Sequence, residues 1–438
     1  MIWVVCLEEY IPKILGRISF CFIILFGLTL SLTAVPSMSS SSSTTQLAAF
    51  AQQTSNELDN RPNILAIMGD DFGWSDIGSF GSEISTPNLD ALAKEGKILT
   101  NYHTAPTCSP ARASFLTGTD WHTSGIGTMY ESISSNQVGK PGYETYITDR
   151  VVTVAELLKD AGYHTLMSGK WHLSGKDNVN GTTPHDRGFE DEFSLAQSGA
   201  NHFTYEPYGT GQVTFVRNGQ VVPKPQNGTY SNDLWTNTMI DMIDKYYKDD
   251  KPLFMYLAFM VAHTPFQAPQ EYIDKYMDVY SVGWDKIREQ RFEKQKELGL
   301  WPANMSLPKR LPPNPAWDSL TDEQKQYWIK VSAVHAGMIE NMDYNIGKLI
   351  QHLKDTGEYD NTLIMFTSDN GSSEPIYSPL DGKLTSTTSE EVRELRARYN
   401  NSIPMIGTED SDVGYGLEGT MLAVSPFLDS NQLNMKEE

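Results

Sequence analysis

Cysteine is scarce in this chain, with three residues in 438. Two of them, Cys6 and Cys21, lie in an N-terminal segment that has the features of an export signal. If that segment is removed, only Cys108 remains, and a single thiol excludes an internal disulfide. A buried apolar cysteine is the ordinary explanation for such a residue. Arg112 argues against it, because it follows one helical turn later and places a permanent cation beside the thiol.

Basic residues are also scarce. The chain has 34 Lys and Arg against 55 Asp and Glu, which gives a formal net charge of -21. This balance, without any basic stripe, excludes nucleic acid as an expected partner. Screening confines the repulsion of other anions to about 8 Å at physiological salt, so a local cationic pocket can still bind a small anion.

Long apolar runs are limited to one, at residues 18–35. We interpret residues 1–36 as a signal peptide, with an uncleaved membrane anchor as the alternative. Either interpretation predicts export to the periplasm or the extracellular space. Residues 37–60 are polar and rich in serine, which is typical of a linker. The folded domain is therefore expected at residues 61–438, a length that can bury a large core.

Short apolar runs alternate with helical patterns over this folded part. Four runs are typical of buried strands, because they are rich in large apolar side chains and are bounded by turn signals. Helices packed against such strands predict an α/β fold in which a large mixed β-sheet is sandwiched by helices. The predicted strands are Asn63–Met68, Tyr163–Met167, Leu253–Phe259 and Thr362–Thr367, and the predicted helices begin at Thr86-Pro87 and cover Ser114–Gly118, Val151–Ala161 and Gln326–Lys354.

Two acidic pairs follow predicted strands, namely Asp70-Asp71 and Asp369-Asn370. A single acidic pair in a loop is usually a solvated turn. In open α/β sheets, however, ligands bind beyond the carboxyl ends of the strands, and two such pairs at strand ends indicate one shared site. Three carboxylates and one amide oxygen are hard ligands, which suit Ca²⁺ or Mg²⁺ and not Zn²⁺. The sequence therefore predicts a site for a divalent cation of this kind.

Several blocks of the chain resemble those of one enzyme family. The stretch Cys108-Ser109-Pro110-Ala111-Arg112, followed by Leu116-Thr117-Gly118, resembles the signature of the type I sulfatases, the formylglycine-dependent arylsulfatases of the alkaline phosphatase superfamily. Gly169-Lys170-Trp171-His172-Leu173 and Ala262-His263-Thr264-Pro265 resemble two further blocks of that family. The resemblance covers roughly residues 61 to 428 and is greatest to the bacterial arylsulfatases. It implies the alkaline phosphatase-like sulfatase fold.

The resemblance also implies a modified residue and a metal. Cys108 would be converted to formylglycine by a formylglycine-generating enzyme, and the aldehyde would hydrate to a geminal diol. One hydroxyl attacks the sulfur of the substrate, and deprotonation of the other re-forms the aldehyde and expels sulfate. A bound cation makes the attacking hydroxyl more acidic. The implied ligands of Ca²⁺, which the resemblance favours over Mg²⁺, are Asp70, Asp71, Asp369, Asn370 and the oxidised side chain of Cys108.

The same resemblance implies the other catalytic residues. Lys170 would bind the sulfate group and the diol, and Arg112 would orient the formylglycine. His172 would take the proton of the diol during sulfate release, and His263 would help to protonate the leaving group. The ordinary alternatives are a surface lysine and satisfied core imidazoles. We expect Cys108, Arg112, Lys170, His172 and His263 to form the catalytic set.

The end of the chain departs from the family pattern. Where the family places a second sulfate-binding lysine and a Glu-Gly-Gly turn, the sequence has Leu428-Asp429-Ser430-Asn431 and ends at Glu438. Neither Lys383 nor Lys436 stands in a matching context. We therefore expect the smaller C-terminal subdomain to be missing and the catalytic domain to be incomplete. Loss of one sulfate-binding cation would cost about 2–4 kcal/mol of transition-state stabilisation.

Together these features predict a sulfuric ester hydrolase of the arylsulfatase type that acts on a small sulfate ester. Sulfate and phosphate share their shape and differ in charge, so a phosphate mono- or diester hydrolase on the same scaffold is an alternative. An inactive, truncated homologue of the sulfatases is the second alternative.

Overall fold

The computed structural model describes residues 2–5, 61–175, 182–207, 213–310, 314–372, 377–378, 383–384, 394 and 397–426. Most of the predicted signal segment, the predicted linker at 37–60 and the stretch Leu428-Asp429-Ser430-Asn431 lie outside the described residues, as does Lys436. None of the helices that the structure describes is long and apolar enough to cross a bilayer.

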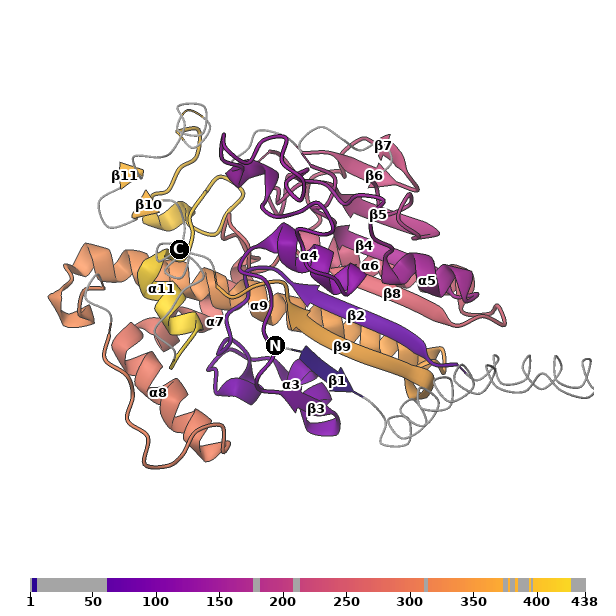
Figure 1. Cartoon of the computed structure of the whole chain (residues 1–438). Helices are drawn as coiled ribbons and strands as arrows, with labels where there is room; N and C mark the ends of the chain where they lie inside the picture. The colour runs from indigo at the N-terminus through magenta and orange to yellow at the C-terminus, as the bar shows by residue number, and fades with distance from the viewer. Residues whose placement is uncertain are drawn as a thin grey trace, which may run out of the picture.

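One large sheet organises the described chain, with strands in the order β3-β1-β9-β2-β8-β4-β5-β6-β7 (Figure 1). The five central strands, from β9 to β5, are parallel, and the outer strands pair antiparallel. This confirms the predicted mixed sheet. The strands of this sheet are β1 (Ile2–Val5), β2 (Asn63–Gly69), β3 (Lys97–Leu99), β4 (His164–Lys170), β5 (Asp191–Leu195), β6 (Phe215–Arg217), β7 (Gln220–Val222), β8 (Leu253–Ala258) and β9 (Thr362–Ser368). In a separate sheet, β10 (Tyr377–Ser378) pairs antiparallel with β11 (Lys383–Leu384).

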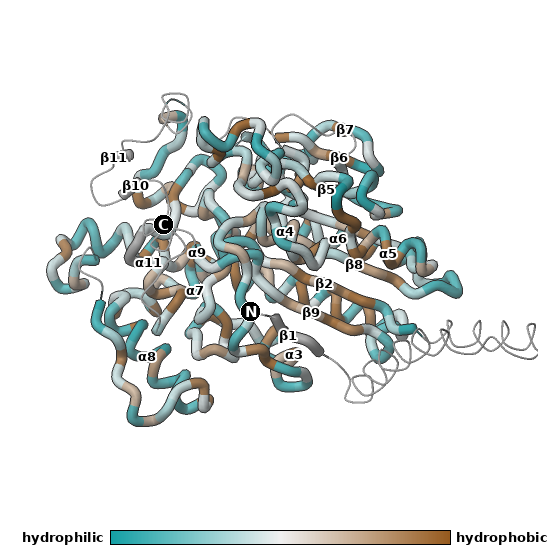
Figure 2. The backbone as a smooth tube through the Cα atoms, in the orientation of Figure 1, coloured by the Kyte–Doolittle hydropathy of each residue, from teal (hydrophilic) through white to brown (hydrophobic). Residues whose placement is uncertain are grey.

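Helices cover both faces of the sheet, as the sequence predicts. In β2, Leu65 and Ile67 belong to one apolar cluster, and Ala66 and Met68 belong to another, because successive side chains of a strand point to opposite faces. Helices α3, α6, α7 and α9 contribute to the first cluster and α4 and α5 to the second. The central strands are accordingly hydrophobic along their length (Figure 2). The helices are α3 (Pro87–Glu95), α4 (Cys108–Thr117), α5 (Val154–Asp160), α6 (Ser231–Tyr246), α7 (Gln270–Tyr280), α8 (Trp284–Glu297), α9 (Asp322–Asp355) and α11 (Gly416–Ala423).

Helix starts differ from the predicted ones where a cap decides them. Helix α9 begins four residues before the predicted Gln326, because Thr321 and Gln324 form a capping box. Helix α5 begins three residues after Val151, because Thr153 caps it through Glu156. In both helices the capping residues, and not the apolar pattern, therefore determine where the helix begins.

Helix α4 shows the largest difference, and it concerns the key cysteine. The sequence places this helix at 114–118, whereas the structure begins it at Cys108. Pro110 lies in the first turn, where proline is tolerated because its missing N–H has no helical partner. Gly118 ends the helix in the left-handed conformation, with φ of 65°. Cys108 is therefore the first helical residue rather than part of a preceding loop.

The strand Ile2–Val5 lies within the segment predicted to be a signal peptide. It pairs antiparallel with β9 on one side and with β3 on the other. Signal cleavage would remove this strand and expose the edge of β9. The signal peptide at residues 1–36 and the domain boundaries remain predictions.

Candidate active site

The parallel strands bring the predicted site residues to one edge of the sheet. Asp70 directly follows β2, Lys170 is the last residue of β4, and Asp369 directly follows β9. Backbone hydrogen bonds hold these ends together: Asp70 N donates to Val261 O at 2.8 Å, and Asp369 N donates to Gly69 O at 3.1 Å. Carboxyl ends of parallel strands form the usual ligand crevice of α/β sheets.

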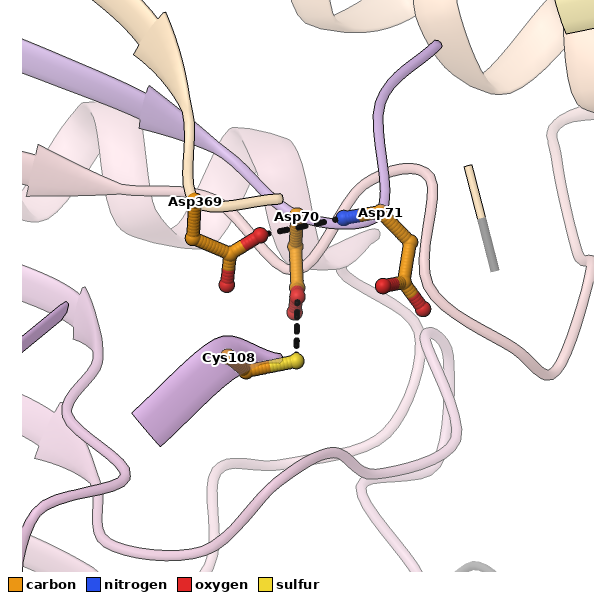
Figure 3. Close-up of side chains that lie close together, drawn as sticks. All are labelled: Asp70, Asp71, Cys108 and Asp369. Carbon is orange, nitrogen blue, oxygen red and sulfur yellow. Dashed lines mark hydrogen bonds between the residues drawn. The ribbon is translucent and has the colours of Figure 1, made fainter. Parts of the chain in front are cut away.

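Three carboxylates and the cysteine form a buried cluster at this edge (Figure 3). One ligand atom from each of Asp70, Asp71, Cys108 and Asp369 lies within 4.8 Å of the others, and all four residues are buried. The Cys108 Sγ lies 3.6 Å from Asp70 Oδ1, and Asp71 N donates to Asp369 Oδ1 at 3.3 Å. Such an arrangement brings all candidate donors within reach of one cation.

Asn370 completes the donor set. Its amide nitrogen donates to Asp71 Oδ1 at 2.6 Å, whereas its Oδ1 is buried and has no hydrogen-bond partner among the described residues. A buried amide oxygen without a partner is costly unless a ligand satisfies it. The set of three carboxylates and this free oxygen fits Ca²⁺.

Two basic side chains, those of Arg112 and Lys170, lie against the acidic cluster. Arg112 donates through Nε to Asp369 Oδ2 at 2.9 Å and reaches the same oxygen through Nη2 at 2.8 Å. Lys170 donates through Nζ to Asp70 Oδ2 at 2.6 Å. Arg112, Lys170, Asp70 and Asp369 all have fully buried side chains. Both predicted cations therefore lie in the site, which contradicts the alternative of a surface lysine.

The charges in the cluster do not balance. Burial would raise the pKa of Asp70, but nearby cations, above all Lys170, hold that pKa well below its usual range. Burial raises the pKa of Asp71 to about 7, and the charge of Asp70 adds to this rise. Burial and Asp70 likewise raise the pKa of Asp369 to about 7. The three carboxylates carry one negative charge more than Arg112 and Lys170 neutralise, and this excess would favour the binding of a divalent cation.

Backbone conformation in the site is unusual at three positions. Asp71 and His172 are in the left-handed region, with φ of 56° and 58°, which is uncommon for residues other than glycine. Gly169 has φ of 120°, and a Cβ there would lie 1.8 Å from Ala258 O. Only glycine fits beside β8 at this position, immediately before Lys170. Strained backbone of this kind clusters at functional sites.

The two predicted histidines differ in what they contact. His263 lies with Nε2 3.9 Å from Asp71 Oδ2, and its Nδ1 bonds Thr264 O at 2.6 Å. Because a carbonyl only accepts, Nδ1 carries the proton and Nε2 of the neutral ring faces the acidic cluster. His172 instead contacts Glu131, with Nε2 3.1 Å from Oε1. His263 therefore lies next to the acidic cluster, whereas His172, two residues after Lys170, is paired with Glu131.

The sequence offered no indication of several residues that support the site. Glu131 lies in the short 3-10 helix η2 (Tyr130–Ser132), which carries no recognisable motif. Asp76 accepts from Gly73 N at 3.0 Å and is itself held by Arg291 of α8 at 2.8 Å. The contacts of Glu131 with His172 and of Asp76 with Arg291 join residues 41 and 215 positions apart, so only the folded structure could reveal them.

Comparisons with known proteins show the family of the chain. A model of the sulfatase family matches residues 62–394. A sulfatase of Schizosaccharomyces pombe is 40% identical over 391 residues, which are 86% of this chain and 68% of the relative. An arylsulfatase of Klebsiella aerogenes is 39% identical over 371 residues, which are 84% of this chain and 76% of the relative. The crystal structure of the sulfatase-family protein yidJ from Bacteroides fragilis has a TM-score of 0.51 at 21% identity, over 78% of this chain and 64% of that one, which shows a shared fold.

Proposed function

The chain belongs to the sulfatase family of sulfuric ester hydrolases, and on this basis we propose that it hydrolyses aryl sulfate esters with an oxidised Cys108 and a bound Ca²⁺. The observation that carries the proposal is the buried cluster of Asp70, Asp71, Cys108 and Asp369 beside two buried cations. A surface turn or a structural ion pair would not need this concentration of unbalanced charge.

The state of Cys108 is central to the proposal. Burial raises the pKa of its thiol well above the usual range; Lys170 opposes this rise, and the surrounding carboxylates add to it. The thiol is therefore protonated at neutral pH and is a poor nucleophile as it stands. The hydrated aldehyde of formylglycine would supply a hydroxyl nucleophile and a release step at the same position. This is the support for conversion of Cys108 by a formylglycine-generating enzyme.

The metal would be held by Asp70, Asp71, Asp369 and the free Oδ1 of Asn370, together with the oxidised side chain at position 108. When bound, Ca²⁺ supplies positive charge that acidifies the nucleophilic hydroxyl and favours the sulfate group.

The other residues act through their own charges and protons. Lys170 and Arg112 present permanent positive charge at the first residue of α4, where a sulfate oxygen would bind. His263 has an unprotonated Nε2 toward the cluster, and burial lowers its pKa, with Lys170 contributing. In the protonated ring, this nitrogen can donate to the oxygen of the leaving group. His172 is the candidate base for sulfate release.

We further propose that the chain is exported through residues 1–36, with membrane anchoring by an uncleaved segment as the alternative. Export is consistent with a chain that would form no internal disulfide, because the thiol of Cys108 would be converted to formylglycine. The substrate would be a small sulfate ester, since the net charge of -21 opposes long-range capture of polyanions.

The proposal is tested by making the full chain with and without a co-expressed formylglycine-generating enzyme. The tryptic peptide Ile98–Arg112 should show the mass of an aldehyde in place of the thiol, and turnover of an aryl sulfate should rise with the converted fraction. Cys108→Ala should lower turnover by roughly 10³-fold or more, as loss of a nucleophile does elsewhere.

Three results would contradict the proposal. Turnover by a chain with an unmodified thiol would exclude formylglycine as the nucleophile. Faster hydrolysis of the matched aryl phosphate would favour a phosphate ester hydrolase. Full conversion to the aldehyde without any turnover, in the presence of Ca²⁺, would favour an inactive homologue.

A further inference from the structure

His172 is held by a carboxylate that comes from a distant part of the chain. Its Nε2 lies 3.1 Å from Glu131 Oε1 and 3.4 Å from Oε2, across 41 residues of sequence. The side chain of His172 is 2% exposed and that of Glu131 is 16% exposed. The ring of Tyr130 meets the imidazole edge to face, with ring centres 6.2 Å apart and planes at 87°. Tyr130 therefore restricts the orientation of the ring plane, and Glu131 holds the Nε2 atom.

This contact decides which nitrogen of His172 carries the proton. An ionised carboxylate only accepts hydrogen bonds, so Nε2 must be the donor. Burial would raise the pKa of Glu131, but His172 lowers it below its usual range, which keeps the carboxylate ionised. In the neutral ring the lone pair therefore lies on Nδ1. The Nδ1 atom is buried and has no hydrogen-bond partner among the described residues.

The charges around His172 favour this neutral ring. Burial lowers its pKa, Glu131 opposes the decrease, and Lys170 and Arg112 add to it. The charged groups that act on the imidazole are thus Glu131 in η2, Lys170 in β4 and Arg112 in α4. A buried nitrogen with a lone pair and no partner, two residues beyond Lys170, is the arrangement expected of a base that waits for a proton.

We propose that Glu131 is a positioning residue that holds His172 in the Nε2-protonated tautomer, so that Nδ1 can take the proton released when sulfate is expelled. The proposal rests on the function proposed above and adds a residue to it. The pairing follows the general logic in which a carboxylate orients a catalytic imidazole, and loss of such a partner typically costs about 10- to 100-fold in activity.

The first test measures kcat and KM for an aryl sulfate against pH in Glu131→Gln. We expect kcat to fall about 10- to 100-fold with KM nearly unchanged. The acidic limb of the kcat profile should move to lower pH, because the carboxylate that favours the protonated ring is gone. Glu131→Asp keeps the charge and should restore part of kcat. Glu144→Gln is the matched control, since Glu144 pairs with Arg150 and is not among the charged groups that act on His172. An acidic limb that stays in place, or a loss no larger than in the control, would overturn the proposal.

The second test does not depend on turnover. Long-range ¹H–¹⁵N spectra of the full chain labelled with ¹⁵N-histidine report the tautomer of each ring, and His172→Gln assigns the signal. The wild-type ring should be protonated at Nε2, and Glu131→Gln should shift population toward protonation at Nδ1. A wild-type ring protonated at Nδ1 would refute the role of Glu131. Because the spectra need no substrate, this outcome is distinct from a failure of the sulfatase proposal.

Discussion

Lys170 Nζ lies 2.6 Å from Asp70 Oδ2, and neither side chain is exposed. The pair joins the ends of the parallel strands β4 and β2, which are not adjacent because β8 lies between them. It therefore depends on both strands ending at the same edge, with Gly169 allowing β4 to lie close against β8. Lys170 is held in place by the acidic site, and its charge lies beside Cys108 before any substrate binds.

Replacing Lys170 with methionine should lower turnover of aryl sulfates by about 10²–10³-fold, the range seen when one preorganised donor is removed from a reaction site. The fold should persist, because Arg112 Nη2 remains 3.6 Å from Asp70 Oδ1. Initial rates and a urea unfolding curve measure the two effects. Lys286→Met is the control, since it breaks an exposed Lys–Glu pair on α8. Equal rates in the two variants would show that Lys170 serves stability alone.

Chelation of Ca²⁺ should abolish turnover and lower the melting temperature. Binding at 100 times the dissociation constant stabilises the folded state by about 2.7 kcal/mol. Asp369→Ala should lose this calcium-dependent shift, because it removes a carboxylate from the cluster. Asp120→Ala, at an exposed residue, should keep it. Identical melting curves of the wild-type protein in excess Ca²⁺ and in excess EGTA would count against the metal site.

Arg291→Met should destabilise the fold by about 3–5 kcal/mol, because it leaves buried carboxylates without their partner. Arg291 donates to Asp76 Oδ1 at 2.8 Å and to Glu83 Oε2 at 2.7 Å, and Asp76 in turn accepts from Gly73 N. The free energy of unfolding in urea measures the change. Lys294→Met breaks only an exposed pair of the same helix and should change stability by less than about 1 kcal/mol. A similar stability for both variants would refute this prediction.

His335 should make the protein less stable as the pH falls. Its ring stacks on Tyr415 with centres 4.0 Å apart, and burial lowers its pKa to about 3. The unfolded chain, with a histidine pKa near 6.5, binds a proton between these values that the folded state does not. Stability is therefore complete above about pH 6.5 and declines toward pH 3, by about 1.4 kcal/mol per pH unit for one such group.

The variant that tests this effect is His335→Phe, which keeps an aromatic ring against Tyr415. Its free energy of unfolding should change less steeply with pH between 6.5 and 4 than that of the wild type. His122→Phe, at an exposed histidine, should leave the slope as it is. Parallel curves for wild type and His335→Phe would show that another group causes the dependence.

Local pattern predicted much of this fold because the central strands are buried on both faces. Continuous apolar runs identified β2, β4, β8 and β9 to within a few residues. Helix boundaries were predicted less well, since a cap residue outside the apolar pattern decides them. The start of α4 was wrong by six residues because the apolar pattern reveals only its second half.

Some residues of the site could likewise be predicted from the sequence, and others could not. Asp70, Asp71 and Asp369 could be predicted because each follows a strand, and parallel strands end together. Glu131 could not, because its partner lies 41 residues away and no periodicity joins them. The same holds for Arg291, which meets Asp76 across 215 residues.

The sequence by itself determined which residue types stand at the strand ends. It therefore predicted that carboxylate and amide oxygens would lie close to two basic side chains, Lys170 and Arg112, and to the thiol of Cys108. Tertiary structure alone decided the protonation and orientation of these groups. Burial and the distance to neighbouring charges set a pKa, and both arise only when segments remote in the chain pack against one another.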